Sequence, residues 1–436
     1  MPLFLSTTDP HFEHRFGAVL TMKREEAPDV DDTVAAIIAD VRARGDAALI
    51  DYTARFDRLT LTPETLAIPA SEVETACAAV PREERAALEL AADRIRAYHA
   101  RQLPADARWT DETGATLGWR WTPLDRVGLY VPGGKASYPS SMLMNAIPAV
   151  VAGVRDMVMC APTPGGEVNP LVLLAARISG VKRIFRIGGA QAVAAMAYGT
   201  ETVPSVDKIT GPGNAYVAAA KRRVFGRVGI DNIAGPSEIL VIADGNNDPV
   251  WIAIDLLSQA EHDEVAQAVL LTTDAAFGRA VAEAVERRLE VLERRQIAGA
   301  SWRDFGVIVT VRDLEEAAEL SDRVAPEHLE LCVADPEALL ARIRHAGAVF
   351  VGAWTPEAIG DYVCGPNHVL PTARSARFSS GLSVLDFMKR TTIAQMTPAA
   401  LREIGPAAEI LARSESLEAH GASVRARLDR LNEGAE

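Results

Sequence analysis

The chain has 436 residues and a formal net charge of −14. A chain of this length buries large hydrophobic cores and is expected to hold two or three domains. Its hydrophobic content of 48% and charged content of 24% are typical of globular proteins. The acidic balance argues against a nucleic acid or an anionic membrane surface as the partner.

The first residues, from Met1 to Ser6, lack the basic region and the long apolar core of a signal peptide. Apolar runs such as residues 146–154 are too short, and too often interrupted by Pro and Gly, to cross a bilayer. The cysteines are scattered without a Cys-x-x-Cys pair and fit buried side chains in a reducing compartment, at Cys77, Cys160, Cys332 and Cys364. We therefore expect a cytoplasmic protein with no membrane partner.

Two long helices are expected before residue 103. The first is predicted to be capped by Asp31 or Asp32. It carries an apolar stripe on one face, formed by Val34, Ile37, Ile38 and Val41. The second runs from about residue 82 to 102 and carries His99, which has no obvious partner and is predicted to lie on the surface.

Between residues 116 and 237 short apolar strands alternate with helices, which is typical of a parallel sheet with helical crossovers. The expected strands are residues 116–123, 126–131, 156–161, 183–187 and 206–210, and the expected helices are residues 141–151, 171–178, 190–198 and 214–225. Glycine-rich turns follow three strands, at Pro132–Gly134, Gly188–Gly189 and Gly211–Gly213. Sites in such sheets lie at the carboxyl ends of the strands.

A second alternating block runs from residue 239 to about residue 371. Its expected strands are residues 239–243, 268–272, 307–310, 329–333 and 348–351, and a long charged helix is expected at about residues 275–295. After Leu382 the alternation stops, and two helical segments remain at about residues 398–411 and 417–431. A helical tail with no strand to cover often packs on a partner subunit.

One helix of the second block carries a possible half of a metal site. It is expected to begin with Asp248 as N-cap and Pro249 as the first helical residue. Gln259 and His262 lie three residues apart near its end, so both side chains project from one face. The partial negative charge of the last carbonyl groups suits a cation. The pair also fits an ordinary polar surface.

Other histidines and carboxylates lie near strands. Glu327 and His328 come just before a strand, and a histidine beside a carboxylate can abstract protons and activate water near neutral pH. Asp361 follows a short helix. His368 lies in a loop bounded by Gly-Pro and Pro, which presents side chains from a stiff backbone. The alternatives are a solvated loop for the first pair and simple turns for the other two.

His420 lies on the last expected helix, in the apolar stripe of Leu417, Val424, Leu428 and Leu431. A histidine at this position is either a core or interface residue or a ligand delivered by the tail. Nitrogen and oxygen donors suit zinc, and Gln259, His262, Asp361 and His420 could form such a set. Their spacing does not establish that they meet.

Nucleotide binding is suggested only by turns. The chain has no Gly-x-Gly-x-x-Gly followed by an acidic residue about twenty positions later. The turns at Gly188–Gln191 and Gly211–Asn214 can approach a dinucleotide, with Tyr130 nearby as a stacking ring, or they are merely tight strand-to-helix turns. The residue pattern alone indicates a metal-assisted enzyme of the α/β class.

Eight separated motifs, spread over nearly the whole chain, resemble those of the histidinol dehydrogenase family in order and spacing. They are Tyr130–Gly134, Gly188–Ala192, Thr210–Asn214, Ile230–Glu238, Asp255–His262, Pro326–His328, Gly365–Thr372 and Glu415–His420. Residues 1–25 match least. Eight such matches by chance are not credible.

The resemblance implies zinc-dependent, NAD-linked oxidation of L-histidinol, through L-histidinaldehyde, to L-histidine, the last steps of histidine biosynthesis. Two NAD would be used per substrate. His328 would be the general base, and Glu327 would activate the water that adds to the aldehyde. Zinc would position the substrate and would not accept hydride.

The resemblance also assigns binding residues. One zinc ion per subunit would be bound by Gln259, His262, Asp361 and His420. Substrate contacts would be made by these four ligands together with Ser237, His328, His368 and Glu415. NAD would be contacted by Tyr130, Gln191 and Asn214.

The fold implied by the family is α/β, with two incomplete Rossmann-like parallel-sheet domains and a small helical C-terminal extension that packs on the partner subunit. The expected division is an N-terminal segment (1–25), a discontinuous core domain with most zinc and substrate residues (26–129 and 238–381), a nucleotide-binding domain (130–237) and the extension (382–436). His420 and Glu415 would come from the other subunit of a homodimer, so the active site would be shared.

Two alternatives remain. A paralogue of the same fold would keep zinc and NAD but oxidise another small polar alcohol, such as a sulfonated diol. The presence of Glu327, His368 and Glu415 together favours histidinol. A catalytically silent dimeric scaffold or ligand-binding module would not need an intact base, water activator and ligand set.

Overall fold

The computed structural model describes residues 1–22, 28–133, 138–233 and 235–433. The chain forms two compact units, the first made of residues 1–102 and 124–387 and the second of residues 103–123 and 388–436. The first unit contains two parallel sheets, which confirms the predicted α/β class. Gly134 and Ala234, which belong to two of the motifs above, lie outside the described residues.

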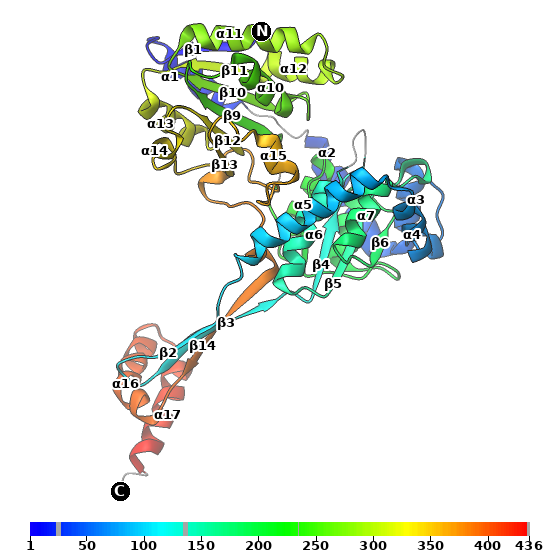
Figure 1. The fold of residues 1–436 in the computed structure, drawn as a ribbon. Helices are drawn as coiled ribbons and strands as arrows, with labels where there is room; N and C mark the ends of the chain where they lie inside the picture. Colours follow the sequence, from blue (N-terminus) through cyan, green and yellow to red (C-terminus); the bar gives the residue numbers. More distant parts are fainter. Residues whose placement is uncertain (23–27, 134–137, 234, 434–436) are drawn as a thin grey trace. The chain divides into compact units, whose positions relative to one another are not determined.

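The larger sheet of the first unit has six parallel strands (Figure 1). Their spatial order is β1 (Leu3–Ser6), β11 (Val307–Thr310), β10 (Gln267–Thr272), β9 (Glu238–Ala243), β12 (His328–Cys332) and β13 (Ala348–Val351). Every residue of β9 is buried, because its side chains enter a hydrophobic cluster on each face of the sheet.

Helices cover both faces of this sheet. One face carries α1 (Phe12–Thr21), α13 (Leu314–Val324) and α14 (Pro336–Leu340). The other carries α10 (Pro249–Ala260), α11 (Ala275–Leu289) and α12 (Arg295–Phe305). The long helix predicted at about residues 275–295 ends earlier, at Leu289, and a separate helix, α12, begins at Arg295. A short helix, α15 (Glu357–Tyr362), contacts β12 and α10.

The second sheet has five parallel strands, in the order β6 (Arg183–Phe185), β5 (Asp156–Cys160), β4 (Arg126–Tyr130), β7 (Lys208–Thr210) and β8 (Gly229–Ile230). Its crossover helices are α6 (Pro139–Ala152), α7 (Pro170–Ile178), α8 (Gly189–Tyr198) and α9 (Ala215–Val224). Because the chain order runs outward in both directions from β4, a topological switch point lies between β4 and β7. Open α/β sheets bind ligands at such points.

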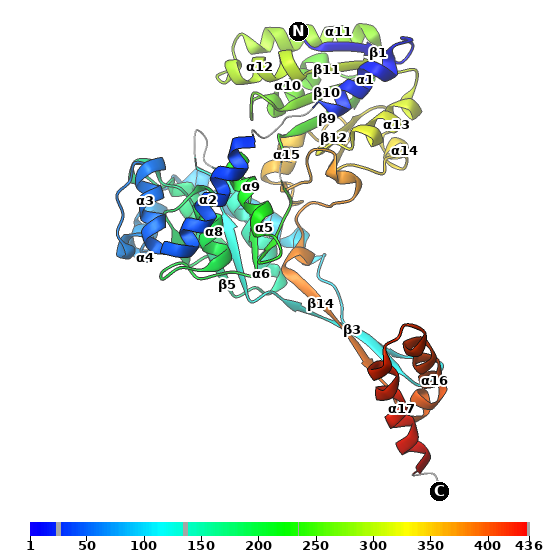
Figure 2. The same ribbon diagram turned by 180° about the vertical axis from the view of Figure 1, so that it is seen from behind.

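The N-terminal helices pack on the second sheet's helices, as Figure 2 shows for α2 beside α8 and α9. These helices are α2 (Pro28–Arg44), α3 (Asp46–Phe56), α4 (Ala70–Ala79) and α5 (Arg82–Ala100). The apolar stripe predicted from Val34 to Val41 is buried there. The sequence predicts a core domain made of residues 26–129 and 238–381, whereas the helices α2 to α5 contact the helices of the five-stranded sheet. Residues 1–25 are predicted to be a separate segment, but β1 pairs with β11 and so belongs to the six-stranded sheet.

Two local predictions in this region are wrong. Asp31 and Asp32 lie inside α2, which already begins at Pro28. His99 is completely buried, and its Nδ1 lies 2.8 Å from the carbonyl oxygen of Ile95. Among the helices of the described residues, none is long and apolar enough to cross a membrane.

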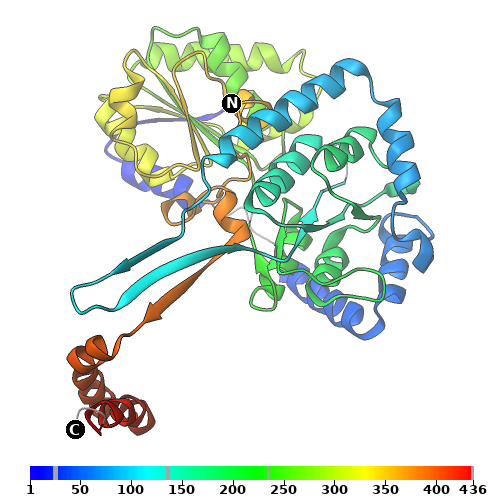
Figure 3. The same ribbon diagram turned by 60° about the horizontal axis from the view of Figure 1, so that its bottom comes forward.

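The second unit combines an antiparallel sheet with two helices. Figure 3 shows its two long strands, in cyan and orange. The order is β14 (Met388–Gln395), β3 (Thr116–Pro123) and β2 (Ala107–Thr110), and the helices are α16 (Pro398–Ser414) and α17 (Glu418–Glu433). The two predicted helices are confirmed, but β14 was not predicted. Its side chains are mostly exposed, so no apolar alternation marks it.

Candidate active site

The main chain of Glu238, the first residue of β9, holds two acid–base side chains at the start of β12. Its N–H donates to Oε2 of Glu327 over 2.9 Å, and its carbonyl oxygen lies 2.9 Å from Nδ1 of His328. A carbonyl oxygen only accepts hydrogen bonds, so Nδ1 carries the proton and the lone pair of Nε2 is available. The imidazole is thus held in the tautomer that a general base requires.

Burial shifts the pKa values of this pair in opposite directions. It lowers the pKa of His328 to about 3 and raises the pKa of Glu327 well above its usual range. The N–H of Glu238 opposes the second shift, and the charges of Glu238, Asp361 and Glu357 add to it. His328 is therefore a neutral imidazole near neutral pH.

Two carboxyl groups of α15 lie near Nε2 of His328, the ring nitrogen that carries no proton. Nε2 lies 3.6 Å from Oε1 of Glu357 and 4.0 Å from Oδ1 of Asp361. Burial raises the pKa of Glu357 to about 8 and that of Asp361 to about 6. One donor atom from each of the three residues lies within 4.8 Å of the others. This spacing suits a cation.

Glu357 was not predicted from the sequence. Its N–H donates to Oε1 of Glu330 over 2.6 Å, and its Oε2 accepts from the hydroxyl of Ser258 over 3.2 Å. These bonds fix the first turn of α15 against β12 and α10. The available signal was its spacing of four residues from Asp361, which places both carboxylates on one helix face.

His368 connects this cluster to α6. Its Nδ1 donates to the carbonyl oxygen of Asp361 over 3.0 Å and lies 3.8 Å from Oδ1 of the same residue. Its Nε2 lies 3.3 Å from the hydroxyl of Ser141 on α6. Burial lowers the pKa of His368 to about 4. The loop residue predicted to touch substrate is thus ordered beside Asp361.

Gln259 and His262 lie at the end of α10. Gln259 is buried, and its Oε1 has no hydrogen-bond partner within the part of the chain that the structure describes. His262 is exposed, although surrounding protein lowers its pKa, with Arg294 and His368 contributing. Besides burial, the charges of His262 and His368 lower the pKa of His328.

The other predicted substrate residues are Ser237, Glu415 and His420. Ser237 immediately precedes Glu238, and its carbonyl oxygen accepts from the N–H of Gln267 over 3.0 Å. Glu415 and His420 belong to the second unit and are exposed there. The interpretation of His420 as a buried core histidine is therefore wrong for the single chain.

The three predicted NAD residues surround the switch point of the five-stranded sheet. Tyr130 ends β4, Gln191 lies in the first turn of α8, and the side-chain oxygen of Asn214 caps α9 by accepting from Tyr216 and Val217. The Tyr130 hydroxyl accepts from the N–H of Gly189 over 3.0 Å.

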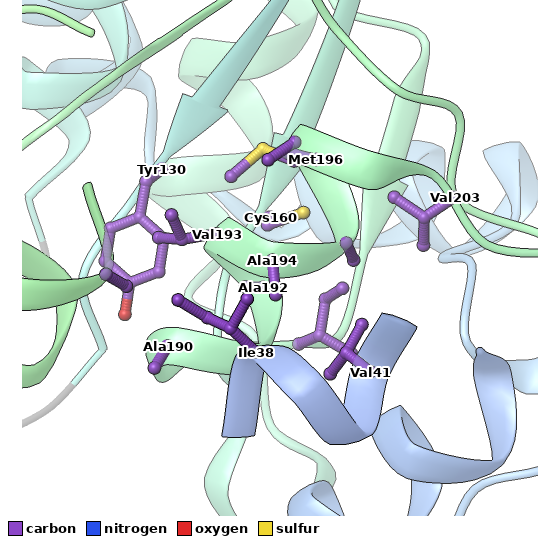
Figure 4. Packing of buried hydrophobic residues seen from close by; sticks show 14 of the residues in the cluster. Ile38, Val41, Tyr130, Cys160, Ala190, Ala192, Val193, Ala194, Met196 and Val203 are labelled. Atoms are coloured by element: carbon purple, nitrogen blue, oxygen red, sulfur yellow. The ribbon is translucent and has the colours of Figure 1, made fainter. Parts of the chain in front are cut away.

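The ring of Tyr130 is buried in a hydrophobic cluster with Val193 and Ala190 (Figure 4). It therefore offers no exposed face for stacking, unlike the predicted stacking ring.

The rule that sites lie at strand carboxyl ends suits this sheet. It does not suit the six-stranded sheet, where Glu327 and His328 lie at the amino end of β12.

Known proteins resemble the chain over its full length. The sequence profile of the family described as Histidinol dehydrogenase matches residues 20–428. The histidinol dehydrogenase of Cereibacter sphaeroides is 76% identical over 434 residues, covering 100% of both chains. That of Ruegeria pomeroyi is 72% identical and covers 99% of this chain and 100% of its own.

A solved structure shares the fold. The crystal structure of histidinol dehydrogenase from Elizabethkingia anophelis superimposes with a TM-score of 0.94 at 36% identity, covering 99% of each chain. Sequence and fold thus agree over nearly the whole chain. The chain belongs to the histidinol dehydrogenase family and is an oxidoreductase of histidine biosynthesis.

Proposed function

We propose that the chain oxidises L-histidinol to L-histidinaldehyde and then to L-histidine, with one zinc ion per subunit and two NAD per substrate. The observation that carries the proposal is the pair of main-chain bonds from Glu238 to Glu327 and His328. They present a neutral imidazole base and a carboxyl group side by side, with Nδ1 of His328 3.6 Å from Oε2 of Glu327.

In the first oxidation, Nε2 of His328 accepts the hydroxyl proton of histidinol while the carbinol carbon transfers hydride to NAD. The aldehyde and an imidazolium result. The carboxylates of Glu357 and Asp361, which lie 3.6 and 4.0 Å from Nε2, stabilise the positive charge on the ring. The proton must leave His328 before the next oxidation.

In the second stage, Glu327 orients a water molecule and accepts one of its protons as the water oxygen bonds to the aldehyde carbon. The imidazolium of His328 gives its proton to the former carbonyl oxygen, which returns His328 to the neutral form. The product is the hydrated aldehyde. One of its hydroxyl groups then loses a proton to His328 as the carbon transfers hydride to the second NAD. The resulting carboxylic acid releases its remaining proton to solvent and becomes the carboxylate of histidine. Burial of both side chains keeps other water away from the aldehyde.

The residues present fit a zinc ion. Gln259 contributes a buried oxygen without a hydrogen-bond partner among the described residues, and Asp361 contributes a carboxylate in a site that disfavours its charge. We propose that these two bind zinc with His262 and with His420 of the partner subunit. When bound, zinc would hold the amino and imidazole nitrogens of the substrate, and its charge would lower the raised pKa values of nearby carboxyl groups. Glu327 would then act as a carboxylate.

A second donor set shares Asp361 with the first. It consists of His328, Glu357 and Asp361. Metal binding by His328 would occupy the nitrogen that the mechanism uses as a base. We therefore assign zinc to the set that leaves Nε2 available.

The end of the five-stranded sheet fits NAD. Two buried oxygen atoms, Oδ2 of Asp57 and Oγ1 of Thr163, lack hydrogen-bond partners within the described ranges. Asp57 lies close enough to Tyr130 for its charge to raise the tyrosine pKa. We propose that dinucleotide hydroxyl groups bind these oxygens, with Gln191 and Asn214 near the phosphates. The missing glycine fingerprint predicts modest NAD affinity.

Exposed apolar surface supports a homodimer. Trp251 and Trp354, whose rings are 5.1 Å apart, lie exposed near α10 and α15 in the first unit. Ile410, Leu411 and Leu417 are exposed in the second unit, next to Glu415 and His420. We propose that two chains cover these surfaces and share the active site. A cytoplasmic location remains a prediction.

The test is the stoichiometry of NADH formation. The protein is mixed with limiting L-histidinol and excess NAD and zinc, and absorbance is followed to completion. Two NADH per histidinol, with loss of turnover after chelation and recovery with zinc, support the proposal. Turnover of a sulfonated diol without turnover of histidinol would instead indicate the paralogous alcohol dehydrogenase.

A further inference from the structure

A buried ion pair lies behind the turn between β7 and α9. Lys221, in the last turn of α9, is 3% exposed, and its ammonium group contacts the carboxylate of Asp231. Both side chains are closed off from water. The resemblance assigned no role to either residue, although Asp231 belongs to one of its motifs.

The pair holds both main-chain polar groups of Gly211. The N–H of Gly211 donates to Oδ2 of Asp231 over 2.7 Å, and its carbonyl oxygen accepts from Nζ of Lys221 over 3.0 Å. Nζ also donates to the carbonyl oxygen of Asn232 over 3.2 Å. The conformation of the turn is therefore held by two buried charged groups, each of which is compensated by the opposite charge of the other.

Gly211 has a conformation that the turn requires. Its φ is +122°, and a Cβ atom there would lie 2.0 Å from the carbonyl oxygen of Tyr130. The main chain of the turn therefore packs directly on the end of β4, at the switch point of the sheet. It leads directly into Asn214, the proposed NAD contact.

The same pair also holds the segment that leads to the catalytic strand. Asn232 donates from Nδ2 to the carbonyl oxygen of Ser380 over 3.2 Å and accepts from the Ser379 hydroxyl over 2.8 Å. Six residues after Asn232 the chain reaches Glu238, whose main chain holds Glu327 and His328. Lys221 therefore binds both the turn at Gly211 and the main chain of Asn232, which precedes Glu238 by six residues.

Stability alone is a weak reason for such a pair, because apolar side chains of similar volume often stabilise a buried site as well or better. We propose that Lys221 and Asp231 are positioning residues for NAD, which hold the Gly211–Asn214 turn in the conformation that receives the dinucleotide. This inference rests on the proposed use of NAD. It predicts that loss of the pair weakens NAD binding more than histidinol binding.

The test compares two double variants at opposite ends of β7. Lys221→Met/Asp231→Leu removes the pair as a whole and leaves no unpaired buried charge. Lys208→Met/Asp386→Leu is the control, because Lys208 begins β7 and donates to Oδ1 of Asp386 over 2.8 Å, away from the turn. For each protein, the dissociation constant of NAD, both KM values, kcat and the melting temperature are measured.

The first variant should raise the KM and dissociation constant of NAD about tenfold, within the range of coupling through residues that do not touch the ligand. Its histidinol KM and its kcat at saturating NAD should stay near wild type, and the control should keep wild-type NAD affinity. Unchanged NAD affinity in the first variant, or an equal rise in the control, would overturn the inference.

Lys221→Arg keeps the positive charge and provides the test if the double variant does not fold. In Lys221→Arg the planar guanidinium cannot reproduce the three directions of the ammonium hydrogen bonds. It should raise the NAD KM by a smaller factor and keep the melting temperature near that of wild type. Wild-type NAD affinity in a folded Lys221→Arg protein would count against the inference. Failure of the wild-type protein to reduce NAD with histidinol would reject the proposed function itself.

Discussion

The carbonyl oxygen of Glu238 lies 2.9 Å from Nδ1 of His328 and fixes which nitrogen of the imidazole carries the proton. The bond is a consequence of the sheet, because β9 and β12 are neighbouring parallel strands and His328 lies opposite Ile239 in the register. The tautomer is therefore set by main-chain geometry. The N–H of the same residue orients Glu327.

Glu357→Gln should lower kcat about tenfold to a hundredfold and leave zinc bound, as expected for a group that supports a site from outside the ligand set. The change removes the ionisable carboxyl group nearest to Nε2 of His328 while preserving the size of the side chain. The measurement is kcat together with zinc content per subunit. Glu337→Gln, an exposed change on α14, is the control and should match wild type. Zinc loss from Glu357→Gln would instead favour the ligand set of His328, Glu357 and Asp361.

A mixed dimer tests the shared active site. His262→Ala and His420→Ala chains are each expected to lack zinc and activity as homodimers. After subunit exchange, a heterodimer would carry both lesions in one site and none in the other, so up to half of the wild-type activity per heterodimer should return. Exchange is verified with differently tagged chains. No recovered activity in verified heterodimers would mean that His420 acts within its own chain.

His99 should make the first unit sensitive to acid. Burial lowers its pKa below the ordinary value, so the unfolded chain binds a proton at higher pH than the folded chain does. The stability it contributes is present above about pH 6.5 and is lost as the pH falls toward the folded pKa. Between pH 7.5 and 5.5, the melting temperature of wild type should fall more than that of His99→Gln. Equal decreases would show that another group dominates.

Much of the fold could be predicted because buried parallel strands leave apolar runs in the sequence. β9 and β10 were evident for that reason, as were α16 and α17 from their periodicity. β14 was not, since pairing with β3 forms it without burying an apolar face. The placement of α2 on α8 was not predictable either, because an apolar stripe does not specify its partner.

The same limit holds for the active site. Residues within motifs could be singled out, but contacts between distant segments could not. Glu357 lies outside every motif, and its role depends on Glu330, which is 27 positions away along the chain. Helical spacing predicts a surface position for His99 because it does not reveal that Asn367 and α6 cover the side chain.

The most direct test of the account is the comparison of His328→Ala with His262→Ala, measured for zinc content and for NADH formation from histidinol. His328→Ala should retain one zinc per subunit and lose kcat by about a hundredfold to ten-thousandfold, the range for loss of a general base. His262→Ala should lose the metal. Zinc loss from His328→Ala, or near-normal turnover without its imidazole, would contradict the assignment of His328 as the base.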